Sequence, residues 1–517
     1  MNRVFKFLAL LSVALAGMAT AETVSAASPC ESLTSFKLSG GIVTSAKLVE
    51  AGQFTPPASP QGGGRGQQAA AMAMYAKLPP FCQVDATLTP SADSSIHIEV
   101  WLPAEGWNGK LVEAGNGSFS SAFGYGPMAQ YLLKRYASTS SDTGHTGDTA
   151  DFAVGHPEKI IDFGYRAVHE NAMAAKAIAT AFYGVALKQA YFDGCSSGGR
   201  QAYGEAQRYP DDFNGIIAGA PGIEFTHQTG AELLTIKWIH NHPDAVIPKE
   251  KLAVLHNAVI AACDQIDGVK DGVLENPLQC KYDPKKLLCK SGDAPDCLTA
   301  PQVQLAELIY KGATFSDGKQ IYPGSVRGTE NGWGNILIRT DPMEYGLDSY
   351  RDVILQDPKW DYLTLDADKD IPAADKSVGG IVNNFDPNLK PFFVRGNKLL
   401  GYQGWADPQN SVINHILYHQ MVIAAVGAKT GANDYRLFMV PGMGHCGGGD
   451  GTTTFDLLSA LDNWVTTGKA PDSILASRVV DNQVVRTRPL CPYPQQAVYK
   501  GTGSTDDAAN FSCAVKK

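Results

Sequence analysis

The feature that most constrains the fold is a G-x-S-x-G motif, in which Gly194 and Gly198 flank Ser196. An apolar run at residues 189–192 precedes the motif, and a helix-compatible run at residues 201–208 follows it. Strand, sharp turn and helix are the context in which this motif exposes a serine hydroxyl at the end of a sheet. The alternative is a Gly/Ser loop that arose by chance, because five-residue matches are common. The flanking pattern favours an elbow that presents Ser196 as a nucleophile.

A serine hydroxyl is a weak nucleophile, so the chain should also supply a base and a carboxylate that orients the base. In an elbow fold these residues follow in the order Ser, Asp or Glu, His. A strand-like run at residues 398–404 leads to a turn with Asp407, and another at residues 435–440 leads to a Gly-rich loop with His445. Each residue alone has an ordinary structural explanation, as a turn aspartate or a loop histidine. Their order and placement favour a catalytic triad of Ser196, Asp407 and His445.

Two backbone amides are candidates for binding the oxyanion that forms when a serine attacks a carbonyl carbon. The first is the amide of Ser197, at the start of the helix after the elbow. The second is expected in the loop after the strand at residues 111–114, at Gly117; the alternative is an ordinary glycine-rich turn. His145 is a rival base, but it precedes the serine. We therefore interpret His145 as a structural or pocket-wall residue.

The first 21 residues have the pattern of a secretory signal peptide. Arg3 and Lys6 precede an apolar run at residues 7–18, and residues 19–21 form a small-x-small cleavage site. The alternative, a membrane anchor, is disfavoured because the run is shorter than the roughly 20 residues that span a bilayer. We expect a secreted protein, periplasmic or extracellular. A net charge of −9 without a basic run argues against nucleic acid or an anionic membrane as a partner.

Ten cysteines in an exported chain indicate disulfides, although the sequence alone does not fix their connectivity. Zinc is disfavoured, because the chain has no C-x-x-C pair. Spacing suggests three local pairs, a fourth pair that would tie down the N-terminal segment, and a fifth that would close a very long loop: Cys263–Cys280, Cys289–Cys297, Cys491–Cys513, Cys30–Cys82 and Cys195–Cys446.

The chain changes character after Pro221, where Asp, Pro and Trp become frequent and helical patterns short. Sheet strands are expected to resume near residues 392–394. We therefore expect a signal peptide at 1–21, a core at 22–222, an inserted lid at 223–390 and the rest of the core at 391–517. Aromatic residues of the lid could wall an apolar pocket, but such residues more often form the core of the lid itself: Trp238, Trp333, Trp360, Tyr345 and Tyr350.

Three motifs together resemble those of the tannase/feruloyl esterase family of α/β hydrolases. They are G-C-S-x-G-G at residues 194–199, G-W-x-D-P at 404–408 and G-x-x-H-C at 442–446. The similarity extends through residues 200–221 and covers nearly the whole mature chain. The family usually has another glycine where this chain has Ser118, one residue after Gly117. The resemblance implies an α/β-hydrolase fold with a large inserted lid. It also implies the five disulfides, in which Cys195–Cys446 places nucleophile and base side by side.

The resemblance, rather than any spacing, implies a serine carboxylic ester hydrolase that acts on small aromatic-acid esters through an acyl-enzyme. A feruloyl esterase is the first interpretation, and a tannase or a mono-hydroxyethyl terephthalate hydrolase is the alternative within the class. A catalytically silent binding protein on the hydrolase fold and an acyltransferase are alternatives from other classes. No organic cofactor is expected.

Residues 263–273 hold three carboxylates separated by Gly turns, which could converge on a hard cation. The offsets differ from those of an EF-hand, and the alternative is a pair of Asp-Gly turns. The resemblance implies a structural Ca²⁺ at this place, far from the chemistry. The implied ligands are three side chains and two backbone carbonyls: Asp264, Asp267 and Asp271 with Val269 and Val273.

Overall fold

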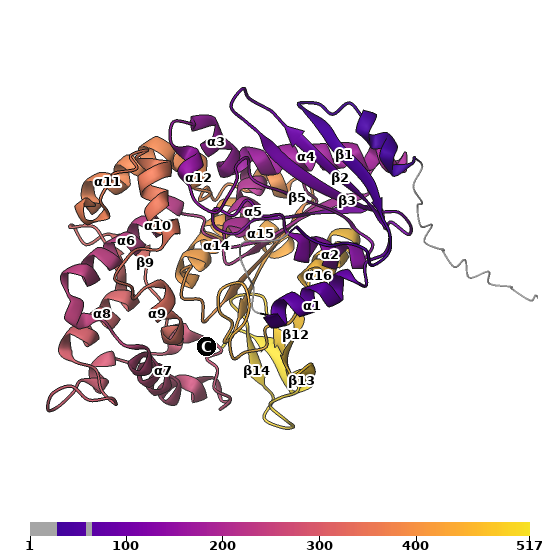
Figure 1. Cartoon of the computed structure of the whole chain (residues 1–517). Coiled ribbons are helices and arrows are strands. Elements are labelled where there is room, and N and C mark those ends of the chain that lie inside the picture. Colours follow the sequence, from indigo (N-terminus) through magenta and orange to yellow (C-terminus); the bar gives the residue numbers. More distant parts are fainter. Residues whose placement is uncertain (1–27, 58–64, 517) are drawn as a thin grey trace, which may run out of the picture.

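A mixed sheet of nine strands forms the centre of the molecule (Figure 1). The computed structural model describes residues 28–57 and 65–516, and the expected signal peptide at 1–21 lies outside them. The strand order is β1-β2-β3-β5-β4-β6-β7-β10-β11, antiparallel from β1 to β5 and parallel from β5 to β11. The strands are β1 Gly41–Val49, β2 Phe81–Leu88, β3 Ile96–Pro103, β4 Lys110–Ala114, β5 Ala137–Ser141, β6 Gln189–Cys195, β7 Gly215–Gly219, β10 Lys398–Gly404 and β11 Tyr435–Val440.

Helices cover both faces of the sheet, as a parallel sheet requires. Strand β7 is buried at all of its positions, so its apolar side chains contact helices on either side. One apolar cluster joins α4, α5 and α14 to the sheet, and a second joins α1, α2 and α16 to the opposite face. The bounds of these helices are α1 Arg65–Tyr75, α2 Tyr125–Leu133, α4 Ala167–Tyr183, α5 Ser197–Arg208, α14 Val412–Val426 and α16 Leu457–Thr467, with shorter helices α3 Pro157–Ile161 and α15 Ala428–Asp434.

Between β7 and β10 the chain leaves the sheet and forms a helical segment to one side of it (Figure 1). One apolar cluster of this segment is its own, and another includes Phe119 and Phe163 of the core. Trp333 and Tyr350 are fully buried inside these clusters. The elements are α6 Phe225–Asn241, α7 Lys249–Cys263, α8 Ala300–Lys311, β8 Gly312–Thr314, β9 Gln320–Pro323, α9 Trp333–Ile336, α10 Glu344–Asp348, α11 Ala367–Ala374, α12 Gly380–Val382 and α13 Lys390–Phe393.

The expected return of the strands near residues 392–394 is wrong, because this place holds the short helix α13 and the sheet resumes at Lys398. Pro391 occupies the first turn of α13, where proline is favoured. Phe392 and Phe393 are both buried in the core. A short apolar run has no period that separates a strand from a helical turn, so the sequence pattern misled here.

All ten cysteines are paired, and the five disulfides are those expected from the sequence. The C-terminal region adds two small antiparallel sheets, formed by β12 Ile474–Val480 with β13 Gln483–Leu490 and by β14 Gln496–Tyr499 with β15 Phe511–Ala514. Across residues 28–57 and 65–516, no helix has both the length and the apolar character needed to cross a bilayer.

Asp462 connects α16 to the sheet. Its carboxylate accepts hydrogen bonds from Lys110 Nζ at 2.5 Å, from the Tyr136 hydroxyl at 2.7 Å and from the Tyr191 hydroxyl at 2.6 Å. Burial raises the pKa of Asp462, but donation from Lys110 and the two tyrosines outweighs burial, so the net pKa is lowered. The stability gained from this carboxylate is therefore present above the pKa of the unfolded chain and is lost as pH falls through the folded pKa.

We predict that Asp462→Asn lowers the free energy of unfolding by about 2 kcal/mol at neutral pH, because charge-assisted bonds are lost. The difference from the wild type should shrink as pH falls below about 4. Denaturant unfolding at several pH values measures both effects. Asp317→Asn, which removes only an exposed pair with Lys319, is the control and should leave stability unchanged. Equal stability of Asp462→Asn and the wild type at neutral pH would contradict this account.

Candidate active site

Ser196 stands at the turn between β6 and α5 with φ 65° and ψ −119°. A positive φ is unusual for a residue with a Cβ atom and is typical of strained functional positions. The turn can be this sharp because α5 crosses the strand ends closely. A Cβ on Gly199 would lie 2.2 Å from the Gly219 carbonyl oxygen, and one on Gly194 would lie 2.6 Å from the Gly198 carbonyl. The glycines of the motif are thus required by backbone packing around Ser196.

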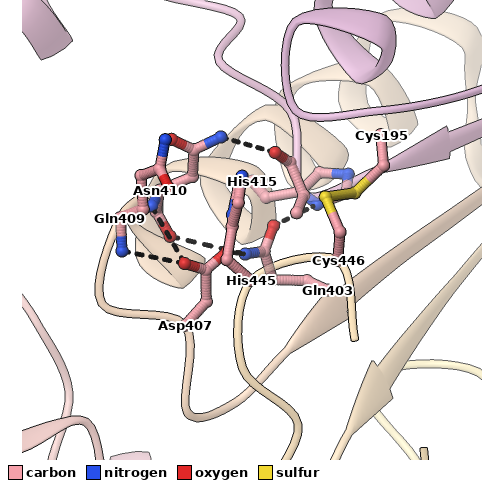
Figure 2. Close-up of a disulfide and its surroundings, with 9 residues drawn as sticks. Cys195, Gln403, Asp407, Gln409, Asn410, His415, His445 and Cys446 are labelled. Carbon is pink, nitrogen blue, oxygen red and sulfur yellow. Dashed lines mark hydrogen bonds and ion pairs between the residues drawn. A yellow bond between two sulfur atoms is a disulfide. The ribbon is translucent and has the colours of Figure 1, made fainter. Parts of the chain in front are cut away.

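Asp407 follows β10 and His445 follows β11, and the two side chains meet (Figure 2). His445 Nδ1 lies 2.9 Å from Asp407 Oδ2, and Asp407 Oδ1 accepts from the backbone amides of Gln409 at 2.8 Å and Asn410 at 3.2 Å. The Asp407 side chain is fully buried, whereas that of His445 is 20% exposed. Because a carboxylate only accepts, a neutral His445 carries its proton on Nδ1 and its lone pair on Nε2, the atom that a general base uses.

The loop that carries His445 folds back across the end of β10. A Cβ on Gly404 would lie 2.3 Å from the carbonyl oxygens of Met443 and Gly444, so this crossing needs a glycine. Cys446, the next residue in the loop, forms a disulfide with Cys195 with the two Cα atoms 6.0 Å apart (Figure 2). The residues next to Cys195 and Cys446 are the candidate nucleophile and the candidate base. The disulfide therefore places Ser196 and His445 on neighbouring stretches of backbone.

Ser196 and His445 line one cavity of about 1080 Å³. Its walls include Gly117, Tyr131 of α2 and Phe455, and no described residue of segment 223–390 takes part. The volume suits a small molecule. His445 Nε2 makes no hydrogen bond with any described residue, so the Ser196 hydroxyl does not reach it in this structure. Catalytic hydrogen bonds are often long in free enzymes and tighten when substrate binds.

The expected oxyanion loop is anchored on the helix that follows Ser196. The backbone amide of Asn116 donates to Gln201 Oε1 at 3.0 Å, and Asn116 Nδ2 donates to the Ser141 carbonyl at 2.8 Å. Gly117 lines the cavity beside Ser196. Ser197 is the first residue of α5, so its amide has no partner within the helix. This placement is compatible with the predicted roles of Gly117 and Ser197.

His145, the rival base, is buried away from the cavity that Ser196 lines. Its Nε2 lies 2.6 Å from the Phe119 carbonyl oxygen, and its ring stacks on Phe152 with centroids 4.0 Å apart. Burial lowers the pKa of His145. These contacts agree with a structural role.

The candidate calcium loop presents oxygen donors of the type that Ca²⁺ prefers. Burial raises the pKa of Asp267 to about 6, and the nearby charges of Asp271 and Asp264 add to the rise. Among the described residues, however, no group of three or more His, Cys, Asp or Glu side chains is arranged as a metal site. Asp271 instead pairs with Arg488 at 2.5 Å. The donor types fit a calcium ion, and the ion remains a prediction.

Sequence reasoning missed Gln403 and His415, which extend the site into the protein. Gln403 Nε2 donates to Asp407 Oδ2 at 2.8 Å, and Gln403 Oε1 lies 3.1 Å from His415 Nδ1 (Figure 2). One signal was available, because Gln403 is a polar residue in a strand that, after Lys398 at its start, is otherwise apolar or glycine. No pattern pointed to His415, which lies on α14 and meets Gln403 only in the folded chain.

Comparison with known proteins agrees with this arrangement. The model of the tannase and feruloyl esterase family matches residues 82–514. An uncharacterized esterase of Xanthomonas campestris pv. campestris is 34% identical over an alignment of 542 residues, gaps included. The alignment covers 95% of this chain and 92% of that protein. A probable feruloyl esterase B-2 of Aspergillus terreus is 32% identical over 462 residues, covering 84% of this chain and 86% of that protein.

Two solved structures share the fold. Feruloyl esterase B from Aspergillus oryzae superposes with a TM-score of 0.86 at 28% identity, over 94% of this chain and 99% of that one. Tannin acyl hydrolase from Aspergillus niger superposes with a TM-score of 0.76 at 21% identity, over 93% of each chain. The sheet, the elbow and these neighbours define an α/β hydrolase that is a carboxylic ester hydrolase. The chain belongs to the tannase and feruloyl esterase family.

We predict that replacing both Cys195 and Cys446 by alanine lowers kcat/KM by about a hundredfold or more, because nucleophile and base are then free to separate. Loss of the long loop closure should also lower the melting temperature. The control replaces Cys289 and Cys297, whose separation is only 8 residues. Ester hydrolysis and thermal melting are measured on both double variants. Full activity of the first variant in a folded protein would contradict a positioning role of this disulfide.

Proposed function

We propose that the protein is a secreted serine esterase that cleaves esters of aromatic acids, with feruloyl esters as the first candidates. The observation that carries the proposal is the hydrogen bond from His445 to Asp407, held beside Ser196 by the disulfide of the two flanking cysteines. Membership of the family and similarity to proteins named feruloyl esterase support the substrate class. Gallate esters and mono-hydroxyethyl terephthalate are the alternatives within that class.

In the proposed reaction, Ser196 Oγ attacks the ester carbonyl carbon while His445 Nε2 takes the hydroxyl proton. Asp407 holds the His445 tautomer and stabilises the imidazolium. The amides of Gly117 and Ser197 bind the oxyanion of the tetrahedral intermediate, at about 3 kcal/mol per donor in related chemistry. The intermediate collapses when His445 protonates the leaving alcohol. Water, deprotonated by His445, then attacks the acyl-enzyme and releases the acid.

We assign the inserted segment at 223–390 to a lid over the acid loop. A Cβ on Gly332 of the segment would lie 2.5 Å from Pro408 Cγ, next to Asp407. Tyr345 of the segment packs against Phe119 with ring centroids 4.9 Å apart. Export is supported by the five disulfides, because disulfides persist mainly in oxidising compartments.

We predict that a fluorophosphonate probe labels the wild type at Ser196, and that Ser196→Ala is neither labelled nor active. Peptide mass mapping identifies the labelled residue. Ser118→Ala is the matched control, because it removes another serine hydroxyl from the same cavity and should remain labelled at Ser196. A wild type that does not react would favour the silent binding protein.

We predict faster hydrolysis of methyl ferulate than of methyl gallate or mono-hydroxyethyl terephthalate, measured as kcat/KM on all three esters. A preference for either of the other two would move the assignment to that alternative within the class. Transfer of the acyl group to an added alcohol without release of free acid would favour the acyltransferase.

We propose that one Ca²⁺ binds the loop at residues 264–273 through Asp264, Asp267 and Asp271 and the carbonyls of Val269 and Val273. The ion would cross-link this loop and contribute stability only. Chelation should lower the melting temperature by about 5 °C, because the ion binds the folded state alone, and added Ca²⁺ should restore it. An unchanged transition at saturating chelator would exclude the site.

A further inference from the structure

A line of buried side chains reaches Asp407 from inside the protein (Figure 2). Gln403 connects Asp407 to His415 Nδ1 through the two contacts given above. His415 Nε2 lies 2.7 Å from the Tyr203 hydroxyl, which lies 2.5 Å from the Tyr435 hydroxyl. Each of these residues is at most 3% exposed. We call them the buried hydrogen-bond chain: Tyr435, Tyr203, His415, Gln403 and Asp407.

The chemistry of the groups allows only one direction of donation along the buried hydrogen-bond chain. A carboxylate only accepts, so Gln403 must present its NH₂ group to Asp407 and its carbonyl oxygen to His415. That oxygen accepts from His415 Nδ1–H, which leaves Nε2 of a neutral ring to accept from the Tyr203 hydroxyl. The Tyr203 oxygen then accepts from the Tyr435 hydroxyl. Each hydrogen bond therefore fixes the orientation of the next group.

His415 is held in the neutral form that this direction requires. Burial, and after it the neighbouring His419, lowers the pKa of His415 to about 3. A neutral imidazole has one donor and one acceptor, whereas a protonated ring has two donors and no acceptor for Tyr203. At neutral pH the ring thus has one defined tautomer, set by the groups on its two sides.

The backbone makes room for the contact between His415 and Tyr203. A Cβ on Gly401 of β10 would lie 3.2 Å from both His415 Nε2 and the Tyr203 hydroxyl oxygen. This spacing is tighter than ordinary van der Waals contact, so a side chain at Gly401 would push the two groups apart. Glycine at this strand position fits a site where two polar groups must approach the backbone closely.

The buried hydrogen-bond chain also connects the elements that carry the candidate triad. Tyr203 lies on α5, the helix that begins after Ser196. Gln403 lies on β10, which leads to Asp407, and Tyr435 begins β11, which leads to His445. Without the His415 contact, the Gln403 oxygen loses its buried donor, so the Gln403 side chain can shift and hold the Asp407 carboxylate less firmly in its place opposite His445.

We propose that Gln403 and His415 are positioning residues, which hold Asp407 in the orientation that His445 needs. This role rests on the proposed function, because it requires Asp407 and His445 to take part in catalysis. Neither residue touches substrate in this assignment. Both act through the carboxylate of Asp407.

Other ionisable groups also face the buried hydrogen-bond chain. His419 and Tyr418 lie on α14, and Arg436 of β11 lies near His419. Tyr322 of β9 lies near Asp407, whose charge, after burial and Glu224, raises the pKa of Tyr322. Of these groups, His419 is the best control for His415. It is a buried histidine one turn further along the same helix and is not part of the buried hydrogen-bond chain.

The test compares His415→Leu, His415→Asn and His419→Leu with the wild type on its best ester. We expect His415→Leu to lower kcat by about tenfold to a hundredfold with little change in KM. This is the size of effect that follows when a hydrogen bond to a charged group is lost. His415→Asn keeps a donor near the position of Nδ1 and should restore much of the rate. His419→Leu should retain the rate of the wild type even if its melting temperature falls.

A pH profile separates positioning from a merely structural role. Gln403→Glu places a second carboxyl group against Asp407, and two buried carboxyl groups this close share one proton until the pH is high enough to ionise both. The value of kcat/KM should therefore fall at high pH, where the two carboxylates repel each other and Asp407 leaves its place, while the wild type keeps its rate there. The proposal is overturned if His415→Leu and Gln403→Glu keep the rate and the pH profile of the wild type, or if His419→Leu loses as much activity as His415→Leu.

A crystal structure of His415→Leu gives a readout that does not depend on ester hydrolysis. We expect the Gln403 side chain to shift and the Asp407–His445 hydrogen bond to break or lengthen. An unchanged bond would overturn the positioning role even in an active enzyme. If the variant loses the bond and the wild type itself hydrolyses no ester, the positioning geometry is supported and the proposed function is rejected. The two failures are therefore distinguishable.

Discussion

The site depends on a covalent bond between the end of β6 and the loop after β11, two strands that are not neighbours. Strands β6 and β11 are separated by β7 and β10 in the sheet, which corresponds to about 14 Å at ordinary strand spacing. The Cα atoms of Cys195 and Cys446 are nevertheless 6.0 Å apart. The loop after β11 closes the gap by crossing the end of β10, where Gly404 leaves room for it. Ser196 and His445 are brought together by this crossing.

Asp407 is held from two directions. His445 contacts one oxygen of its carboxylate on the cavity side, and backbone amides of the turn after β10 contact the other. The buried hydrogen-bond chain reaches the same carboxylate from the core. The disulfide holds the site on the cavity side, and the buried hydrogen-bond chain holds it on the core side. Both connect the site to α5 and the sheet.

The sequence predicted the parts of the site that have local signatures. The elbow around Ser196, the turn with Asp407 and the loop with His445 each follow a strand, and the structure places each of them there. Gln403 and His415 could not be assigned, because their meeting depends on how α14 packs beside β10. The strand expected near Phe392 is a helical turn, because a short apolar run carries no period. The contact of Asp271 with Arg488 joins residues 217 apart in the chain, which no local pattern reveals.

The most direct test of the central claim is a crystal structure of the wild type inactivated by a phosphonate ester. The account predicts phosphorus bonded to Ser196 Oγ, the phosphonyl oxygen facing the amides of Gly117 and Ser197, and His445 Nε2 within about 3.2 Å of the Ser196 oxygen. A phosphonate on another residue, or a His445 ring turned away from Ser196 with the disulfide intact, would contradict it.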